Sequence, residues 1–197
     1  MSKIDILIAG VGGQGTILAG NLISRLGVKE NLDVKTAETH GMAQRGGSVI
    51  THVRLADKVY SPLIPRGDID YLLSFEKLEA LRNLPFLVSE STIIYNAQQL
   101  NPLPVLTGAD EYPPNISEEI TSKVKNCYEI ETLDYEPVKT NPRVLNTFLI
   151  GVLSYFLPFE FSSWEKVLHE VLPPKLLEIN QEALRAGYKW SEKSLNH

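Results

Sequence analysis

A glycine-rich turn near the N-terminus carries the first residues that could do chemistry. Gly10, Gly12 and Gly15 have the spacing G-x-G-x-x-G, and Gly13 adds a further position without a side chain. Glycines at this spacing let backbone N–H groups approach a phosphate at the positive end of a helix. They would equally serve a tight turn with close strand–helix packing and nothing bound. The candidate cofactor-binding residues are Gly10, Gly12, Gly13, Gln14, Gly15 and Thr16.

A second segment, "ETHGMAQRGG" from Glu38 to Gly47, combines glycines with side-chain donors. No helix or strand requires that mixture, and glycines allow positive φ or the close approach of another backbone. Arg45 could hold a carboxylate or phosphate through two parallel hydrogen bonds. The loop therefore suits an anionic ligand. The alternative is a solvated connection in which Arg45 pairs with Glu38.

Other reactive side chains give weaker signals. Glu38 lies roughly where a dinucleotide-binding turn would place its ribose-binding acid, but Arg45 or His40 could pair with it instead. His40 and His52 have no third ligand at suitable spacing, so we predict no metal site. Cys127 has no adjacent base or helix start to lower its pKa. No serine or cysteine can be paired with a base, so we predict no catalytic residue in this chain.

Alternating strand and helix patterns must position the two polar segments. We expect a Rossmann-like α/β fold, a three-layer sandwich with a mostly parallel sheet and additional C-terminal helices, as a single domain over residues 1–197. Helices are expected at residues 16–27, 76–84, 117–126, 143–156, 162–172 and 175–193, and strands at 4–10, 33–38, 48–55, 71–75, 91–96 and 127–132.

Local signals add detail to these elements. Ser117 is expected to cap its helix, and Ser162 and Glu165 to form a capping box. The prolines of residues 101–115 should forbid regular structure there, except for a short edge strand near Val105. The segment "LIGVLSYF" is apolar nearly all round and should be buried against the sheet or a partner.

Composition narrows the classes of function. The chain has 197 residues, is 43% hydrophobic, and carries a formal net charge of -5. The acidic balance argues against non-specific binding to nucleic acid or to an anionic membrane. The N-terminal apolar run is too short to span a bilayer and lacks the features of a signal peptide, so we expect a cytoplasmic protein. One cysteine cannot hold an iron–sulfur cluster, which normally takes four.

Three segments in the same order resemble a known family. "GVGGQGTILAGNLI", "ETHGMAQRGGSVITHVRL" and "VYSPLIPRGDIDYLLSFEKLEALR" are similar to the small, gamma-type subunits of 2-oxoacid:ferredoxin oxidoreductases, especially the small subunit of the indolepyruvate type. The similarity runs from Ile4 to about residue 83, with a weaker echo in "NTFLIGVLSYF". Three ordered segments are far more specific than the glycine spacing alone.

The resemblance implies a subunit of an oxidoreductase complex that is inactive by itself. In that family a 2-oxoacid is decarboxylated on thiamine diphosphate, electrons pass through iron–sulfur clusters to ferredoxin, and acyl-CoA is released. It further implies that thiamine diphosphate and the clusters sit in a large partner subunit, that none is tightly bound in this chain, and that coenzyme A is a co-substrate. By analogy, the residues facing that partner's active site are Thr39, His40, Gly41, Gln44, Arg45, Gly46 and Gly47.

Two other functions fit the glycine turn. One is a free-standing oxidoreductase that binds NAD or flavin, which would keep its cofactor and act alone. The other is a non-enzymatic module that binds a nucleotide or coenzyme A. The resemblance favours an aryl 2-oxoacid such as indolepyruvate as the substrate of the complex, although the partner is expected to read most of its side chain.

Overall fold

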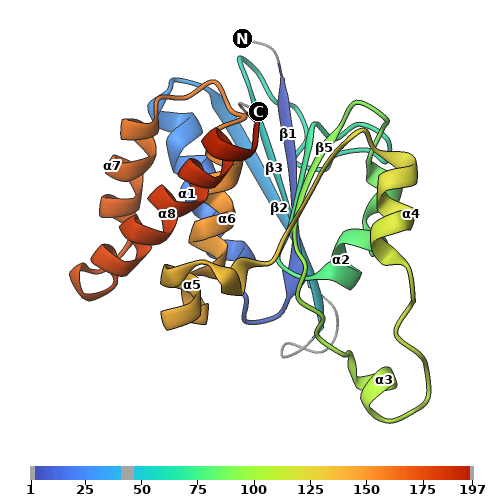
Figure 1. Cartoon of the computed structure of the whole chain (residues 1–197). Coiled ribbons are helices and arrows are strands. Elements are labelled where there is room, and N and C mark those ends of the chain that lie inside the picture. The colour runs from blue at the N-terminus through green and yellow to red at the C-terminus, as the bar shows by residue number, and fades with distance from the viewer. Residues whose placement is uncertain (1–2, 41–46, 196–197) are drawn as a thin grey trace.

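The computed structural model describes residues 3–40 and 47–195. Their sheet has six strands in the order β2-β3-β1-β4-β5-β6. The strands are β1 (Ile4–Val11), β2 (Asp33–His40), β3 (Ser48–Ala56), β4 (Tyr71–Ser74), β5 (Thr92–Asn96) and β6 (Asn126–Ile130). Each predicted strand is confirmed, with ends that differ by no more than two residues. Figure 1 shows the sheet between two layers of helices, as expected for the predicted sandwich.

The sheet is mostly parallel, with one antiparallel strand that the sequence did not reveal. β1, β4, β5 and β6 pair in parallel, in the registers Ile6↔Tyr71, Tyr71↔Thr92 and Thr92↔Asn126. β3 is antiparallel to both β1 and β2 and lies between them. β2 therefore runs parallel to β1 but forms the edge of the sheet, whereas a simple βαβ unit would place the two strands side by side.

Helices cover both faces of this sheet. They are α1 (Thr16–Lys29), α2 (Lys77–Arg82), α3 (Leu103–Leu106), α4 (Ile116–Lys123), α5 (Glu136–Thr140), α6 (Leu145–Ser154), α7 (Phe161–Val171) and α8 (Pro174–Leu195), with 3-10 turns at Leu84–Phe86, Thr132–Asp134 and Pro142–Val144. α1, α6, α7 and α8 lie on one face, and α2 and α4 on the other (Figure 1). None of the helices in the described part of the chain is long and apolar enough to cross a membrane.

Each face of the sheet has its own hydrophobic core. Side chains alternate along β1, so that Ile6 and Ile8 join the core beneath α1 and α6, while Leu7 and Ala9 join the core beneath α2 and α4. A strand buried on both faces is a nearly continuous apolar run, which is how β1 reads in the sequence.

The most apolar helix is enclosed, as predicted. All ten residues of α6 are buried. Ser191 of α8 donates its hydroxyl to the Val152 carbonyl at 3.1 Å, and Thr147 donates to Asn180 Oδ1 at 2.6 Å. α6 and α8 come this close because glycines, Gly151 and Gly187, occupy the contact between them.

Three local predictions were wrong. Residues 103–106 form the short helix α3 and not an edge strand, because Pro104 lies in the first turn, where no N–H donor is needed. α4 begins one residue before Ser117, and its N-cap is Asn115 in the left-handed conformation. α7 has Glu160 as its N-cap with no side-chain capping bond, and Glu165 accepts a hydrogen bond from Arg185 Nε at 2.7 Å.

Candidate functional site

The glycine turn lies at the end of the sheet formed by the C-terminal ends of the parallel strands. β1 and β2 both run toward the lower end of the molecule in Figure 1, where the chain turns into α1. In open α/β sheets ligands bind outside the carboxyl ends of the strands. The fold thus places the predicted residues at the edge where a ligand is expected.

Three positions of the turn favour glycine because of their backbone conformation or their close neighbours within the chain. Gly13 and Gly15 have φ values of 103° and 84°, which side-chain-bearing residues rarely adopt. A Cβ on Gly15 would lie 2.3 Å from Asn146 Nδ2, and one on Gly10 would lie 3.0 Å from Gln14 Oε1. By contrast, a Cβ on Gly13 meets no heavy atom of the described residues within 4 Å. The described residues therefore leave space beside the Gly13 backbone.

Helix α1 begins without a side-chain cap. Its N-cap is Gly15, and its first turn contains no acidic residue. The first backbone bond of the helix runs from the Ala19 N–H to the Gly15 carbonyl at 3.0 Å. The amides before Ala19 point out of the helix start and carry its partial positive charge, which favours an anion there. Thr16, in this turn, is 4% exposed.

The side-chain amide of Gln14 holds the turn in place through two hydrogen bonds within the chain. Its Oε1 accepts the Val11 N–H at 2.7 Å, and its Nε2 donates to the Phe75 carbonyl at 3.1 Å. Asn96 donates to the same Phe75 carbonyl at 3.2 Å. Gln14 was predicted to bind a cofactor, but this geometry gives its amide a structural task, joining the turn to the segment that follows β4.

A stability measurement can check this assignment of Gln14. We expect Gln14→Ala to lower the free energy of unfolding by about 1–2 kcal/mol, because two hydrogen bonds are lost at a half-buried site. Gln14→Glu keeps the acceptor but loses the donor, and should fall between Gln14→Ala and the wild type. Urea unfolding gives the three values. A Gln14→Ala variant as stable as the wild type would contradict the structural role.

The second predicted segment meets the first. The Gly12 N–H donates to the Gly47 carbonyl at 2.9 Å, so the end of the loop is bonded to the glycine turn. Thr39 is exposed near the end of β2, and the backbone of His40 pairs with Val49. Gly41, Gln44, Arg45 and Gly46 lie outside the described residues. The two segments therefore lie at the same end of the sheet, although the bonded residues Gly12 and Gly47 are 35 positions apart in the sequence.

Buried acids that the sequence analysis did not single out support this edge. Glu79 is 2% exposed; its carboxylate accepts hydrogen bonds from Ser48 Oγ and Arg82 Nη1, each at 2.5 Å. Ser48 directly follows Gly47, so Glu79 fastens the end of the loop to α2. Glu76 is 1% exposed, and its Oε2 accepts the Glu79 N–H at 2.9 Å. The only local signal was the acid-to-arginine spacing in "EALR"; nothing in the sequence pointed to Ser48.

The sheet order weakens the dinucleotide interpretation of Glu38. Glu38 lies opposite Thr51 in β3, and β3 separates its strand from β1. Neighbouring strands are about 4.8 Å apart, so the strand of Glu38 is about 10 Å from β1, one strand spacing farther than the adjacent strand that carries a ribose-binding acid.

His52 and Cys127 are built into the fold. Within residues 3–40 and 47–195, no three His, Cys, Asp or Glu side chains lie close enough together to hold a metal ion. His52 Nδ1 accepts the Ile64 N–H at 3.3 Å, and the ring meets Phe86 edge-on. Cys127 lies in β6, where burial raises the pKa of its thiol to about 11 and disfavours the reactive thiolate.

The environment of His52 predicts a pH effect on stability. Burial, and to a lesser extent the charge of Arg54, lowers the pKa of His52 from 6.5. The folded protein therefore resists a proton that the unfolded chain accepts. The contribution of His52 is intact above about pH 6.5 and falls as the pH drops, by up to about 1 kcal/mol per pH unit. His52→Asn keeps an acceptor but does not titrate. Unfolding at pH 7.5 and pH 5 should show a smaller loss for the variant, and equal losses would contradict the prediction.

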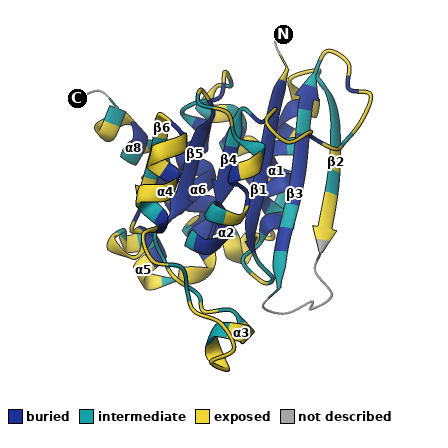
Figure 2. Cartoon of the chain, turned by 90° about the vertical axis from the view of Figure 1, so that its right-hand side faces the viewer, coloured by how far each residue is buried: buried dark blue, intermediate teal, exposed yellow. Residues whose placement is uncertain are grey.

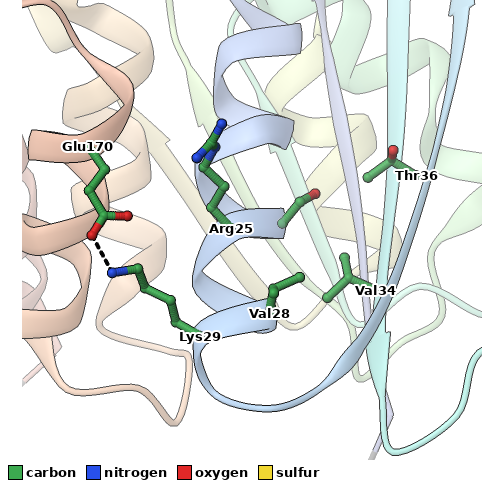
Figure 3. Close-up of a pocket in the computed structure, with 7 residues that line it drawn as sticks. Arg25, Val28, Lys29, Val34, Thr36 and Glu170 are labelled. Carbon is green, nitrogen blue, oxygen red and sulfur yellow. Dashed lines mark hydrogen bonds and ion pairs between the residues drawn. The ribbon is translucent and has the colours of Figure 1, made fainter.

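The described pocket at α1 is remote from the glycine turn. It has a volume of about 320 Å³ between α1, β2 and α7 and is lined by Arg25, Val28, Lys29, Val34 and Glu170 (Figure 3). An ion pair between Lys29 and Glu170 closes one side. The α1 residues of the lining, Arg25, Val28 and Lys29, lie on the C-terminal half of that helix, so the pocket is separate from the candidate site at the start of the helix.

Comparison with known proteins gives matches along most of the chain. Residues 5–190 match the family described as pyruvate ferredoxin/flavodoxin oxidoreductase. The indolepyruvate oxidoreductase subunit IorB of Archaeoglobus fulgidus is 35% identical over 190 residues, which cover 94% of both chains. The protein of the same name from Pyrococcus horikoshii is 36% identical over 203 residues, which cover 100% of both.

Solved structures share the fold at lower identity. The 2-oxoglutarate:ferredoxin oxidoreductase of Magnetococcus marinus, solved with 2-oxoglutarate, coenzyme A and succinyl-CoA bound, superposes with a TM-score of 0.76 and 21% identity over 98% of this chain. This chain spans 32% of the length of that one. The gamma subunit of a keto/oxoacid ferredoxin oxidoreductase from Geobacter sulfurreducens gives a TM-score of 0.69 and 17% identity, covering 96% of this chain and 99% of that subunit.

Proposed function

Because the chain belongs to the pyruvate ferredoxin/flavodoxin oxidoreductase family, we propose that it is the small, gamma-type subunit of a 2-oxoacid:ferredoxin oxidoreductase complex. In this reaction the 2-oxoacid loses carbon dioxide, its acyl group passes to coenzyme A, and the released electrons reduce ferredoxin. The observation that carries the proposal is the near-full-length match to indolepyruvate oxidoreductase subunits, at 35% identity over 94% of both chains. The whole chain acts as one gamma-type domain.

The redox groups belong to a large partner subunit. When bound there, thiamine diphosphate supplies the chemistry of decarboxylation, and iron–sulfur clusters carry the electrons to ferredoxin. The single cysteine in the sequence supports this division of labour, since cluster ligation normally takes four thiolates. The raised pKa of Cys127 points the same way. The complex works in the cytoplasm, where free thiols and clusters stay reduced.

The contribution of this chain is the surface at the end of the parallel strands. The open backbone at Gly13 and the uncapped start of α1 suit a phosphate group, and coenzyme A is the co-substrate that carries phosphates. The loop that ends at Gly47 is bonded to this turn through Gly12, so both segments face the same ligand or the same partner surface. Arg45 is the loop residue best suited to grip a carboxylate or phosphate.

The substrate class is an aryl 2-oxoacid such as indolepyruvate. Support for it comes from the names of the relatives with the highest identities quoted above. Co-expression with the large subunit, followed by purification through a tag on the small one, tests the proposal. The purified complex should reduce ferredoxin with indolepyruvate and coenzyme A, at a kcat/KM at least about tenfold above that for pyruvate or 2-oxoglutarate. A preference for pyruvate would overturn the substrate class, and activity of the small chain alone would overturn the subunit role.

A further inference from the structure

A short arm projects from the fold with two leucines at its tip. The arm comprises residues 98–112 and contains α3; every residue of α3 is at least partly exposed. Leu103 and Leu106 are 71% and 68% exposed. Figure 2 shows α3 standing clear of the body, beyond the end of the sheet at which β2 stops. Two large apolar side chains are thus held in solvent, away from both hydrophobic cores.

The arm has a defined backbone despite this exposure. The Leu106 N–H donates to the Pro102 carbonyl at 3.0 Å, and the Thr107 N–H donates to the Leu103 carbonyl at 3.0 Å. The Ala109 N–H closes the turn on the Pro104 carbonyl at 2.9 Å. Prolines restrict the backbone before binding, so less conformational entropy is lost when the arm is seated on a partner.

One buried carboxylate fixes both ends of the arm. Glu76 Oε1 accepts the Leu100 N–H at 3.0 Å and the Tyr112 hydroxyl at 2.8 Å. Burial, and then this hydrogen bond to Glu76, raises the pKa of Tyr112. Because Glu76 also caps α2 through Glu79, the arm is anchored beside the segment that supports the candidate site.

The charge of the arm indicates which kind of partner surface it would bind. Residues 98–112 include Asp110 and Glu111 but no lysine or arginine. An apolar tip with acids beside it is complementary to an apolar pocket with a basic rim. A second copy of this chain suits it less well, since each copy carries a net charge of -5.

We propose that the arm docks on the large partner subunit, with Leu103 and Leu106 in an apolar pocket and Asp110 and Glu111 against basic side chains at its rim. This inference rests on the proposed function, because that function supplies the partner. It assigns an interaction surface at the edge of the sheet that also carries the glycine turn. Docking there would hold that turn toward the partner's active site.

A matched pair of double variants tests the docking. Leu103→Ser/Leu106→Ser removes the apolar tip, and Leu63→Ser/Leu176→Ser removes two leucines that are 57% and 41% exposed elsewhere on the surface. Binding of each full-length variant to the large subunit is measured by surface plasmon resonance. We expect the tip variant to raise the Kd at least about tenfold and the control to change it less than about twofold. Circular dichroism should show unchanged folding for both, because all four side chains are exposed.

The charges are tested separately. Asp110→Asn/Glu111→Gln should slow association and flatten its dependence on salt, while Glu178→Gln/Glu182→Gln on α8 should leave both unchanged.

If the wild-type chain forms an active complex and the tip variant binds equally well, the docking site is wrong and the proposed function stands. If the wild-type chain binds no large subunit, both fail. A wild-type chain that dimerises by sedimentation, while its tip variant stays monomeric, would make a second copy the occupant and overturn the proposal.

Discussion

Replacing Gly13 with leucine is expected to lower kcat/KM of the assembled oxidoreductase by about 100-fold without preventing assembly. An added Cβ at Gly13 meets no atom of the described residues within 4 Å, whereas one at Gly10 or Gly15 meets a side-chain atom at 3.0 Å or 2.3 Å. In our account a phosphate of coenzyme A approaches the backbone there. A bulky side chain would exclude or misplace it, and the KM for coenzyme A should rise most.

Gly67 provides the matched control for this substitution. It also has a positive φ, of 72°, and a Cβ built on it likewise meets nothing within 4 Å among the described residues. It lies in the connection between β3 and β4, away from the glycine turn. Both variants should lose about 1–2 kcal/mol of stability through backbone strain, but only Gly13→Leu should lose activity. Equal activity in the two assembled variants would remove Gly13 from the site.

The second large effect is expected in the contact between α6 and α8. Gly187→Ala should lower the free energy of unfolding by about 3 kcal/mol. A Cβ at Gly187 would lie 1.9 Å from the Phe148 carbonyl oxygen, and one at Gly151 would lie 2.1 Å from the Leu184 carbonyl oxygen. These neighbours are backbone atoms, which cannot rotate away, so the two helices must separate.

Helix propensity alone predicts that Gly187→Ala would raise the free energy of unfolding, so the sign of the measured change distinguishes the two effects. Within an exposed helix, changing glycine to alanine stabilises by about 1 kcal/mol. Ser194→Ala, at an exposed position on the same helix, is the control and should change stability by less than about 0.5 kcal/mol. Chemical denaturation of the isolated chain measures both. A Gly187→Ala variant as stable as the wild type would show that α6 and α8 are not in the contact described here.

Local patterns in the sequence were sufficient to predict most of the framework. β1, the glycine turn and α1 follow from a buried apolar run, glycines and helical spacing within thirty residues. The burial of α6 follows from its composition alone. The position of β3 between β1 and β2 could not be predicted, because the pairing of strands depends on contacts between distant residues and not on local preference.

The residues that support the candidate site could not be predicted from the sequence, because their contacts join positions that are far apart in the chain. Glu79 meets Ser48 across 31 positions, and Asn146 meets Gly15 across 131. Neither contact leaves a local pattern. The sequence likewise did not show that the Gln14 side chain makes two hydrogen bonds within the chain, because one of its partners, Phe75, is 61 positions away. The arm was misread because proline density was taken to forbid a helix, although proline is favoured in a first helical turn.

We propose that this chain completes an oxidoreductase whose redox groups lie in another subunit. The most direct measurement is the rate of 2-oxoacid- and coenzyme A-dependent ferredoxin reduction by the purified small chain, by the purified large subunit, and by their mixture as the small chain is titrated in. We predict no turnover from the small chain, and a rate in the mixture that rises to a plateau at a fixed ratio of the two. Turnover by the small chain alone, or a rate of the large subunit that does not respond to its addition, would show that the small chain is not a required subunit.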